Sequence, residues 1–323
     1  MRGKEKKMAE TNIAQAVEAA NYAVSYDANI KFLLADKQVL ARILKYAVRE
    51  FQSTELEDIM ASIGNDIEIG AKPVDTGLSN MGRISESNTE DNIPGEGKIF
   101  YDIRFSAYHR KLEMKFLINV EAQRSSDPGK LGYHLENRII FYLSRMISAQ
   151  KQTEFYHSDY DSLKRVRSIW ICLDSSEDGD SIEEINLDRK NVFGTKESPY
   201  NIDLMRGIII RVRTGMNIKE SQNVLISMLE KLLSQMGVDE KKHILASEYG
   251  MIMTTELEGR IKTMCNLSQA IEARGIEKGI EKGIEKERLN AIERMIKAGA
   301  TKEQIVLYGY TEEEMIEAEK VYM

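Results

Sequence analysis

Hydrophobic residues near the start of the chain recur every three to four positions. Between residues 36 and 51 this spacing predicts a helix that begins behind Asp36, a residue type that caps helix N-termini. Its apolar positions are Val39, Leu40, Ile43, Leu44, Ala47, Val48 and Phe51. A second, shorter helix is expected at residues 53–63. Residues 64–97 are rich in Gly, Asn, Ser and Pro, which predicts mostly loop with one short strand at 65–70.

From Lys98 the pattern changes from a helical period to alternation. Every second residue is apolar over residues 98–107 and again over 113–123, as in β-strands with a buried face. The connection between the two segments is short enough for a hairpin. The two strands are therefore predicted to be antiparallel neighbours.

The remaining pattern predicts the other elements of a mixed α/β domain. Helical spacing returns over residues 133–150, and an apolar run at 166–174 predicts a buried strand. Further strands are expected at 182–188 and 205–213, and the chain is helical in pattern after about Lys219. The order helix, strand, strand, helix, strand is typical of a mixed α/β fold.

Residues 275–287 repeat the sequence Gly-Ile-Glu-Lys. On a helix, Ile276, Ile280 and Ile284 form one slowly drifting stripe, and Lys and Glu residues three apart can pair. The three glycines weaken such a helix by roughly 1 kcal/mol each relative to alanine. Two interpretations remain open: a solvated, semi-rigid helix, or a helix that packs on a second copy or another partner through its small Gly face.

Composition excludes several classes of protein. The chain has 323 residues, 42% hydrophobic and 30% charged, which suits one or two soluble domains with a sizeable core. Cys172 and Cys265 lie far apart without CxxC spacing, which argues against a disulfide framework or structural zinc and fits a reducing cytoplasm. No apolar run is long enough to span a membrane, so we expect a cytoplasmic protein without a membrane partner. Because the formal net charge is −7, any contact with a polyanion must be local.

Polar residues interrupt the most strand-like segment of the chain. Asn119, Glu121 and Gln123 are two residues apart, so their side chains project from the same face of the predicted strand. Asp102 lies on the neighbouring strand, and a register that brings it opposite this row forms a carboxylate pair. Mg²⁺ suits such a pair, because it binds through one or two carboxylates and completes its shell with water and substrate phosphate. Gln123 would orient the water or bind the metal, and the alternative is a solvated polar face.

Several segments, taken in order, resemble one known family. They are "YDANIKFLLADKQVLARILK", "YDIRF", "FLINVEAQ", "RIIFYLSR", "SIWICLD" and the Gly-Ile-Glu-Lys repeat. Together, from about Asp27 to the repeat, they resemble the PD-(D/E)XK nuclease family transposases, also called recombination-promoting nucleases. The resemblance implies a restriction-endonuclease-like mixed sheet flanked by helices at residues 20–215, and a helical C-terminal region at 216–323. It also implies a metal-dependent DNA endonuclease, which hydrolyses phosphodiester bonds in recombination or transposition.

The resemblance assigns roles to individual residues. Asp102 and Glu121 fall on the family's catalytic acids, which bind Mg²⁺. Gln123 falls where the wider pattern has lysine, and it supplies dipoles in place of a fixed charge, so a weaker nuclease or a stricter metal requirement is expected. The alternative is a catalytically inactive DNA-binding or oligomerising protein that retains the nuclease fold. Asp27 matches the family's N-terminal Asp motif, without a spacing argument of its own.

The distribution of charge indicates where DNA would lie. Residues 103–167 hold twelve Lys and Arg against seven Asp and Glu, a local excess of five positive charges. Within this region Arg138, Tyr142 and Arg145 fall at i, i+4 and i+7 on the predicted helix, on one face that can contact phosphate. The alternative is a partly buried helix face with snorkelling arginines. DNA is the expected partner, together with a second copy of the chain bound through the C-terminal helices.

Overall fold

The chain folds into two compact units. One spans Ala23–Cys265, and the other contains the residues from Asn266 onward. The structure is a computed structural model, and it describes residues 25–70, 90–93, 97–100, 102–175, 179–196, 198–200, 202–213 and 220–322.

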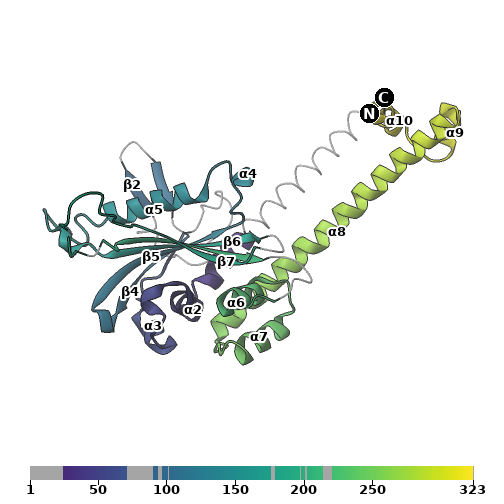
Figure 1. Cartoon of the computed structure of the whole chain (residues 1–323). Helices are drawn as coiled ribbons and strands as arrows, with labels where there is room; N and C mark the ends of the chain where they lie inside the picture. Colours follow the sequence, from purple (N-terminus) through teal and green to yellow (C-terminus); the bar gives the residue numbers. More distant parts are fainter. Residues whose placement is uncertain are drawn as a thin grey trace. The chain divides into compact units, whose positions relative to one another are not determined.

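A six-stranded mixed sheet lies at the centre of the first unit (Figure 1). Its strands, in spatial order, are β1 (Glu68–Ile69), β4 (Ile103–His109), β5 (Met114–Gln123), β6 (Arg165–Ser175), β8 (Met205–Arg213) and β7 (Ser181–Asn186). Strands β5, β6 and β8 are parallel, whereas β1 pairs antiparallel with β4, β4 with β5, and β7 with β8. The predicted mixed α/β class is therefore confirmed.

The predicted hairpin is confirmed as the β4–β5 pair, in which Ile103 lies opposite Val120. The predicted strand at 98–107 is, however, divided in two. Strand β3 (Gly97–Phe100) pairs with β2 (Glu90–Ile93) in a separate two-stranded sheet, and β4 begins only after Asp102. The apolar alternation continues across this division, so periodicity alone does not reveal it. Strand β2 also lies in the region predicted to be mostly loop.

Alternation along the strands gives the sheet two buried faces. One face packs against α2 (Lys37–Ala47), α3 (Leu56–Ser62) and α6 (Val224–Leu233), and the other against α5 (Leu135–Ser148). Figure 1 shows α5 on one side of the sheet and α2, α3 and α6 on the other. Helix α5 packs closely on β8, because a Cβ atom added at Gly207 would lie 2.3 Å from Cγ2 of Ile139.

A local side-chain contact fixes the start of α2. The Asp36 carboxylate accepts a hydrogen bond from the amide of Gln38 at 2.9 Å, which confirms the predicted cap of this helix. Residues 25–34, before α2, are also helical. The remaining elements of this unit are η1 (Arg49–Phe51), η2 (Arg110–Leu112), α4 (Pro128–Leu131), η3 (Tyr160–Ser162) and α7 (Val238–Ser247).

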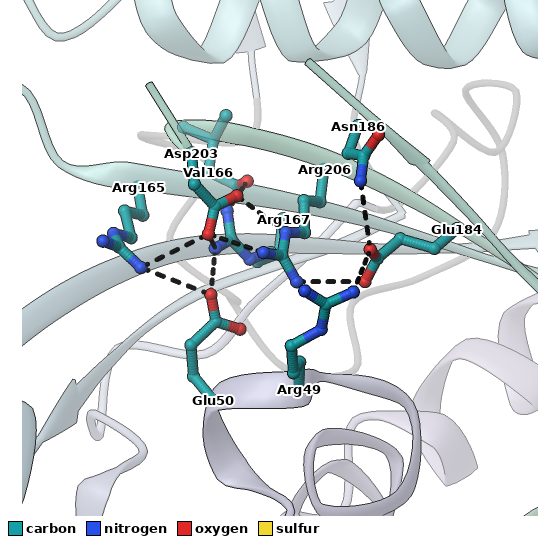
Figure 2. Close-up of polar contacts among 9 residues, drawn as sticks. All are labelled: Arg49, Glu50, Arg165, Val166, Arg167, Glu184, Asn186, Asp203 and Arg206. Atoms are coloured by element: carbon teal, nitrogen blue, oxygen red, sulfur yellow. Dashed lines mark hydrogen bonds and ion pairs between the residues drawn. The ribbon is translucent and has the colours of Figure 1, made fainter. Parts of the chain in front are cut away.

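A network of charged side chains lies where β6 and β8 begin (Figure 2). Its members are Arg49, Glu50, Arg165, Arg167, Glu184, Asp203 and Arg206, with Asn186 at its edge. Arg167 is fully buried and forms an ion pair with Glu50 of η1. Arg206 binds Asp203 at 2.6 Å and Glu184 at 3.1 Å. Burial opposes ionisation of Glu50, but the Arg167 guanidinium outweighs it and lowers the pKa of that carboxyl.

The second unit is helical, as the sequence predicts for its C-terminal part. The 43-residue helix α8 (Thr255–Lys297) begins in the first unit, contains the Gly-Ile-Glu-Lys repeat, and is followed by α9 (Lys302–Leu307) and α10 (Glu312–Tyr322). A small core of Ile292, Ile305, Met315 and Ala318 joins the three helices. Among the described helices, none combines the length and apolar character needed to cross a membrane.

Candidate active site

Asp102 and Glu121 meet at the open end of the β4–β5 hairpin. Ile103 pairs with Val120, so the next position outward sets Asp102 opposite Glu121. The amide of Asp102 donates to Oε1 of Glu121 at 3.1 Å, and the amide of Ala122 donates to Oδ2 of Asp102, also at 3.1 Å. The structure therefore brings together the two acids that the sequence singles out.

Glu121 is buried, with 3% of its surface exposed. Burial, together with the neighbouring charge of Asp102, raises the pKa of Glu121 to about 8. Hydrogen bonds from the Asp102 amide and from Nδ2 of Asn119, at 3.1 Å, oppose this rise and do not overcome it. Without a bound cation, Glu121 is therefore mostly protonated at neutral pH.

Asn119 adds an unsatisfied oxygen to this site. Its side chain is fully buried, and its Oδ1 atom has no hydrogen-bond partner in the described part of the chain. Ser168, its register partner on β6, accepts a hydrogen bond from the Trp170 indole at 2.8 Å. A buried amide oxygen without a partner carries a desolvation cost that a water or a cation would remove.

Gln123 is held by α5. Its Oε1 accepts from Arg138 at 3.4 Å, and the same guanidinium donates to the hydroxyls of Tyr133 at 2.8 Å and Tyr142 at 2.9 Å. The Arg138 guanidinium also lies 5.0 Å from the Trp170 ring and 5.2 Å from the Tyr142 ring. These contacts fix the guanidinium and, through it, the amide of Gln123.

The three residues predicted to bind DNA do not share one exposed face. Tyr142 is buried, with 6% of its surface exposed, and Arg138 is half-buried and directed toward Gln123. Arg145 is also half-buried. Contact with phosphate by these residues stays a prediction, and Arg138 and Tyr142 are placed to order the site from its α5 side.

Lys31 is a site residue that the sequence reasoning missed. Its Nζ atom lies 2.5 Å from Oδ1 of Asp102, and only 14% of its side chain is exposed. Asp27, four residues earlier in the same helical segment, pairs with Arg124 at 2.8 Å. Spacing of four places Lys31 one helical turn after Asp27 on the same face, but this spacing does not indicate a contact with Asp102, so no sequence signal identified Lys31.

The donor atoms present fit a small, hard cation. Among the described residues, no three His, Cys, Asp or Glu side chains gather to hold a metal. Mg²⁺ needs fewer, because it binds through one or two carboxylates and keeps several waters. The Asp102–Glu121 pair supplies these carboxylates, and Gln123 and Asn119 carry amide oxygens nearby. A cation here would favour the ionised form of Glu121, whose pKa is otherwise raised.

Comparison of the chain with family models, with curated proteins and with solved structures yields no match. Inference about function therefore depends on the geometry of this site.

Proposed function

We propose that the chain is a Mg²⁺-dependent DNA endonuclease of the PD-(D/E)XK type that acts in recombination or transposition. The observation that carries the proposal is the Asp102–Glu121 pair, in which a buried acid with a pKa of about 8 adjoins a second carboxyl directly before the neighbouring strand. Perturbed acids of this kind cluster at functional sites. We assign the mixed sheet to the restriction-endonuclease-like fold for the same reason, because Asp102 directly precedes β4 and Glu121 lies on β5.

We assign the residues of the site separate roles in phosphodiester hydrolysis. Asp102 and Glu121 would hold Mg²⁺, and bound Mg²⁺ would help to activate water and to stabilise negative charge on the phosphate. The Ala122 amide orients Asp102, and Asn119 orients Glu121. Gln123, fixed by Arg138, is placed to orient a water molecule at the same end of β5.

Local charge supports DNA as the substrate. Residues 103–167, from the β4–β5 hairpin through α5 to the start of β6, hold this excess of five positive charges, although Arg167 among them is fully buried against Glu50. Lysine and arginine that neutralise phosphates release counterions, so binding should weaken steeply as salt rises. The proposed location is the cytoplasm.

The deciding experiment is single-turnover cleavage of supercoiled plasmid and linear duplex, with and without Mg²⁺. Wild type should cleave only with the metal, and Asp102→Ala or Glu121→Ala should abolish cleavage while DNA binding persists. Undiminished cleavage by Asp102→Ala would refute the proposed site.

A second function is favoured by one observation, the uncharged Gln123 at the position where the resemblance expects lysine. In that case the chain binds DNA or self-associates without turnover. Absence of cleavage by wild type with Mg²⁺ or Mn²⁺, together with salt-dependent DNA binding, would support this alternative.

A further inference from the structure

The position two residues after Glu121, on the same face of β5, does not hold a cation. Gln123, two residues after Glu121 on β5, is a neutral amide whose oxygen accepts from Arg138 at 3.4 Å. An amide supplies only dipoles to an attacking water or to a phosphate, whereas a fixed positive charge stabilises the added negative charge of the transition state more strongly.

We propose that Lys31 supplies this charge from a different element, in the hydrolysis that the proposed function assumes. Its ammonium nitrogen lies 2.5 Å from Oδ1 of Asp102, whose other oxygen is held by the Ala122 amide at 3.1 Å. Lys31 thus reaches the acid pair from the helical segment at 25–34, which precedes the sheet in the chain.

The segment that carries Lys31 is anchored on both sides. Asp27 binds Arg124, the residue that follows β5, at 2.8 Å. The carbonyl of Phe32 accepts from Arg260, whose guanidinium lies 5.7 Å from the Phe32 ring. Leu33 and Leu34 are fully buried in the core below. These contacts place the ammonium before any substrate binds, which is the condition for effective electrostatic stabilisation.

Arg138 is less suited to the same task. Its donors reach Gln123, Tyr133 and Tyr142, and its guanidinium is stacked on aromatic rings, so reorientation toward a phosphate would break several contacts. An ammonium has three donors on a flexible stem, and the contact with Asp102 uses one of them. Lys31 can therefore hold Asp102 while it donates to water or to a phosphate oxygen.

The chemical step balances without a proton from Lys31. The oxygen of water forms a bond to phosphorus, and the bond from phosphorus to the leaving oxygen breaks. The proton lost by water passes to solvent, and the leaving oxygen takes a proton from solvent. Lys31 would stabilise the charge on the phosphate and the developing hydroxide without transferring a proton itself.

The alternative is a purely structural ion pair that orients Asp102. The two roles differ in one respect, because a structural ion pair depends on the position of Lys31, whereas a catalytic charge can be moved. Lysine introduced at position 123, on the strand that carries Glu121, should therefore compensate for loss of the charge at position 31.

The test is single-turnover cleavage of a linear duplex in Mg²⁺ by the full chain and four variants. These are Lys31→Met, Lys31→Arg, Gln123→Lys and the double variant Lys31→Met/Gln123→Lys. Lys37→Met is the matched control, because Lys37 is also partly covered and anchored, by Asn65 Oδ1 at 2.8 Å, but lies away from the acids.

We expect Lys31→Met to slow cleavage by about a hundredfold, the usual effect of removing one stabilising donor. DNA affinity and thermal unfolding should change little. Lys31→Arg should retain part of the rate, and the double variant should recover at least tenfold over Lys31→Met. Lys37→Met should cleave like wild type.

The outcomes separate this inference from the proposed function. If wild type cleaves and Lys31→Met cleaves equally fast, Lys31 does not supply the charge that stabilises the transition state, and the nuclease proposal stands. If Lys31→Met is slow, remains folded, and the double variant recovers nothing, the ion pair is structural and the inference is also overturned. If wild type does not cleave with any divalent metal, the proposed function fails, and this inference fails with it.

Discussion

The main-chain amide of Asp102 donates a hydrogen bond to the carboxyl group of Glu121 at 3.1 Å, although the charge of Asp102 raises the pKa of the same Glu121. One residue therefore both orients Glu121 and disfavours its ionisation. A buried acid beside a second, partly buried one ionises only at high cost without a cation close to both. This relationship leads to a first prediction that can be tested without any cleavage assay.

The first prediction concerns pH and the metal-free protein. Because the pKa of Glu121 is raised to about 8 on folding, the native state holds a proton that the unfolded chain releases near pH 4.5. The stabilisation this proton provides is fully present below pH 4.5 and is lost as pH rises toward 8. We expect Glu121→Gln, which stays neutral, to lose less stability over that interval than wild type.

Thermal unfolding at pH 5 and pH 8.5, with EDTA and with Mg²⁺, measures this effect. The melting temperature of Glu121→Gln relative to wild type should rise by several degrees between the two pH values in EDTA. Added Mg²⁺ should stabilise wild type more than the variant, and more at pH 8.5, because metal binding displaces the proton. Parallel curves for the two proteins, or equal stabilisation by Mg²⁺, would contradict the assigned environment of Glu121.

The second prediction concerns Arg138 as a positioning residue. Arg138→Met should release the Gln123 amide and lower the single-turnover rate by about tenfold, the scale of positioning effects. It should alter DNA affinity little, because the guanidinium is already engaged by two tyrosine hydroxyls. Gln123→Ala should have a comparable, mild effect, well below that of Asp102→Ala.

Combining the two substitutions provides the control. If Arg138 acts through Gln123, the double variant should be no slower than Gln123→Ala, because residues that act as a unit are not additive. A large loss of DNA affinity in Arg138→Met, with a reduced salt dependence, would restore the sequence-based prediction of direct phosphate contact.

Site residues that lie close together in the sequence could be predicted, whereas those brought in from distant segments could not. Alternation within β5 located Glu121 and Gln123, and the short hairpin connection brought Asp102 opposite, because both signals are local. Lys31 escaped because it joins the acids from a helical segment 71 residues before Asp102, and single-sequence periodicity carries no information on such a contact. The burial of Tyr142 likewise depends on how closely α5 packs against Trp170.

The same contrast between local and long-range contacts holds for the fold. The cap at Asp36 and the strand that contains Trp170 are local and were predicted. The division of the strand at Asp102 was not, because partners on either side of it, β2 and β5, determine where pairing changes. The ion pair between Glu50 and Arg167 was not predicted either, because the two residues are 117 positions apart in the sequence.

The third prediction concerns the charged network at the start of β6. Glu50→Gln would leave the fully buried Arg167 with only its longer carboxylate contact, to Asp203 at 3.5 Å, and should destabilise the first unit by about 3 kcal/mol, the cost of breaking a buried pair. Because the pKa of Glu50 is lowered on folding, the stabilisation is present above the unfolded value of 4.5 and declines as pH falls below it. The difference between wild type and variant should therefore shrink in acid.

Denaturant unfolding at pH 7 and pH 3.5 checks this prediction. Arg49→Ala is the matched control, because Arg49 belongs to the same network but is 65% exposed in its pair with Glu184. Its effect should stay below about 1 kcal/mol, as for other surface pairs. Equal effects of the two substitutions would contradict the central place of the Glu50–Arg167 contact.

The last prediction concerns the repeat within α8. Ile280 and Ile284 are each 57% exposed, and a Cβ atom added at Gly279 or Gly283 would meet no atom within 4 Å in the described chain. Among the described residues, packing within the chain therefore accounts for none of these four positions. We predict that a second copy covers them, because small residues let two helices approach closely and exposed isoleucines gain from burial. On a helix, the sequence spacing sets Glu and Lys of the repeat on opposite flanks of the Gly-Ile stripe, so a parallel pair would bring unlike charges together.

Sedimentation of the full chain tests self-association through this face. Ile280→Gln/Ile284→Gln should shift the protein toward monomer, whereas Ile296→Gln, on the same helix outside the repeat, should not. The sharper variant is Gly279→Leu/Gly283→Leu, because leucine raises helix propensity by nearly 1 kcal/mol per site but blocks close approach. Weaker association together with higher helicity would distinguish a contact between copies from a general effect on the helix. Monomeric behaviour of wild type at all concentrations would instead favour the solvated helix, in which the glycines only soften α8.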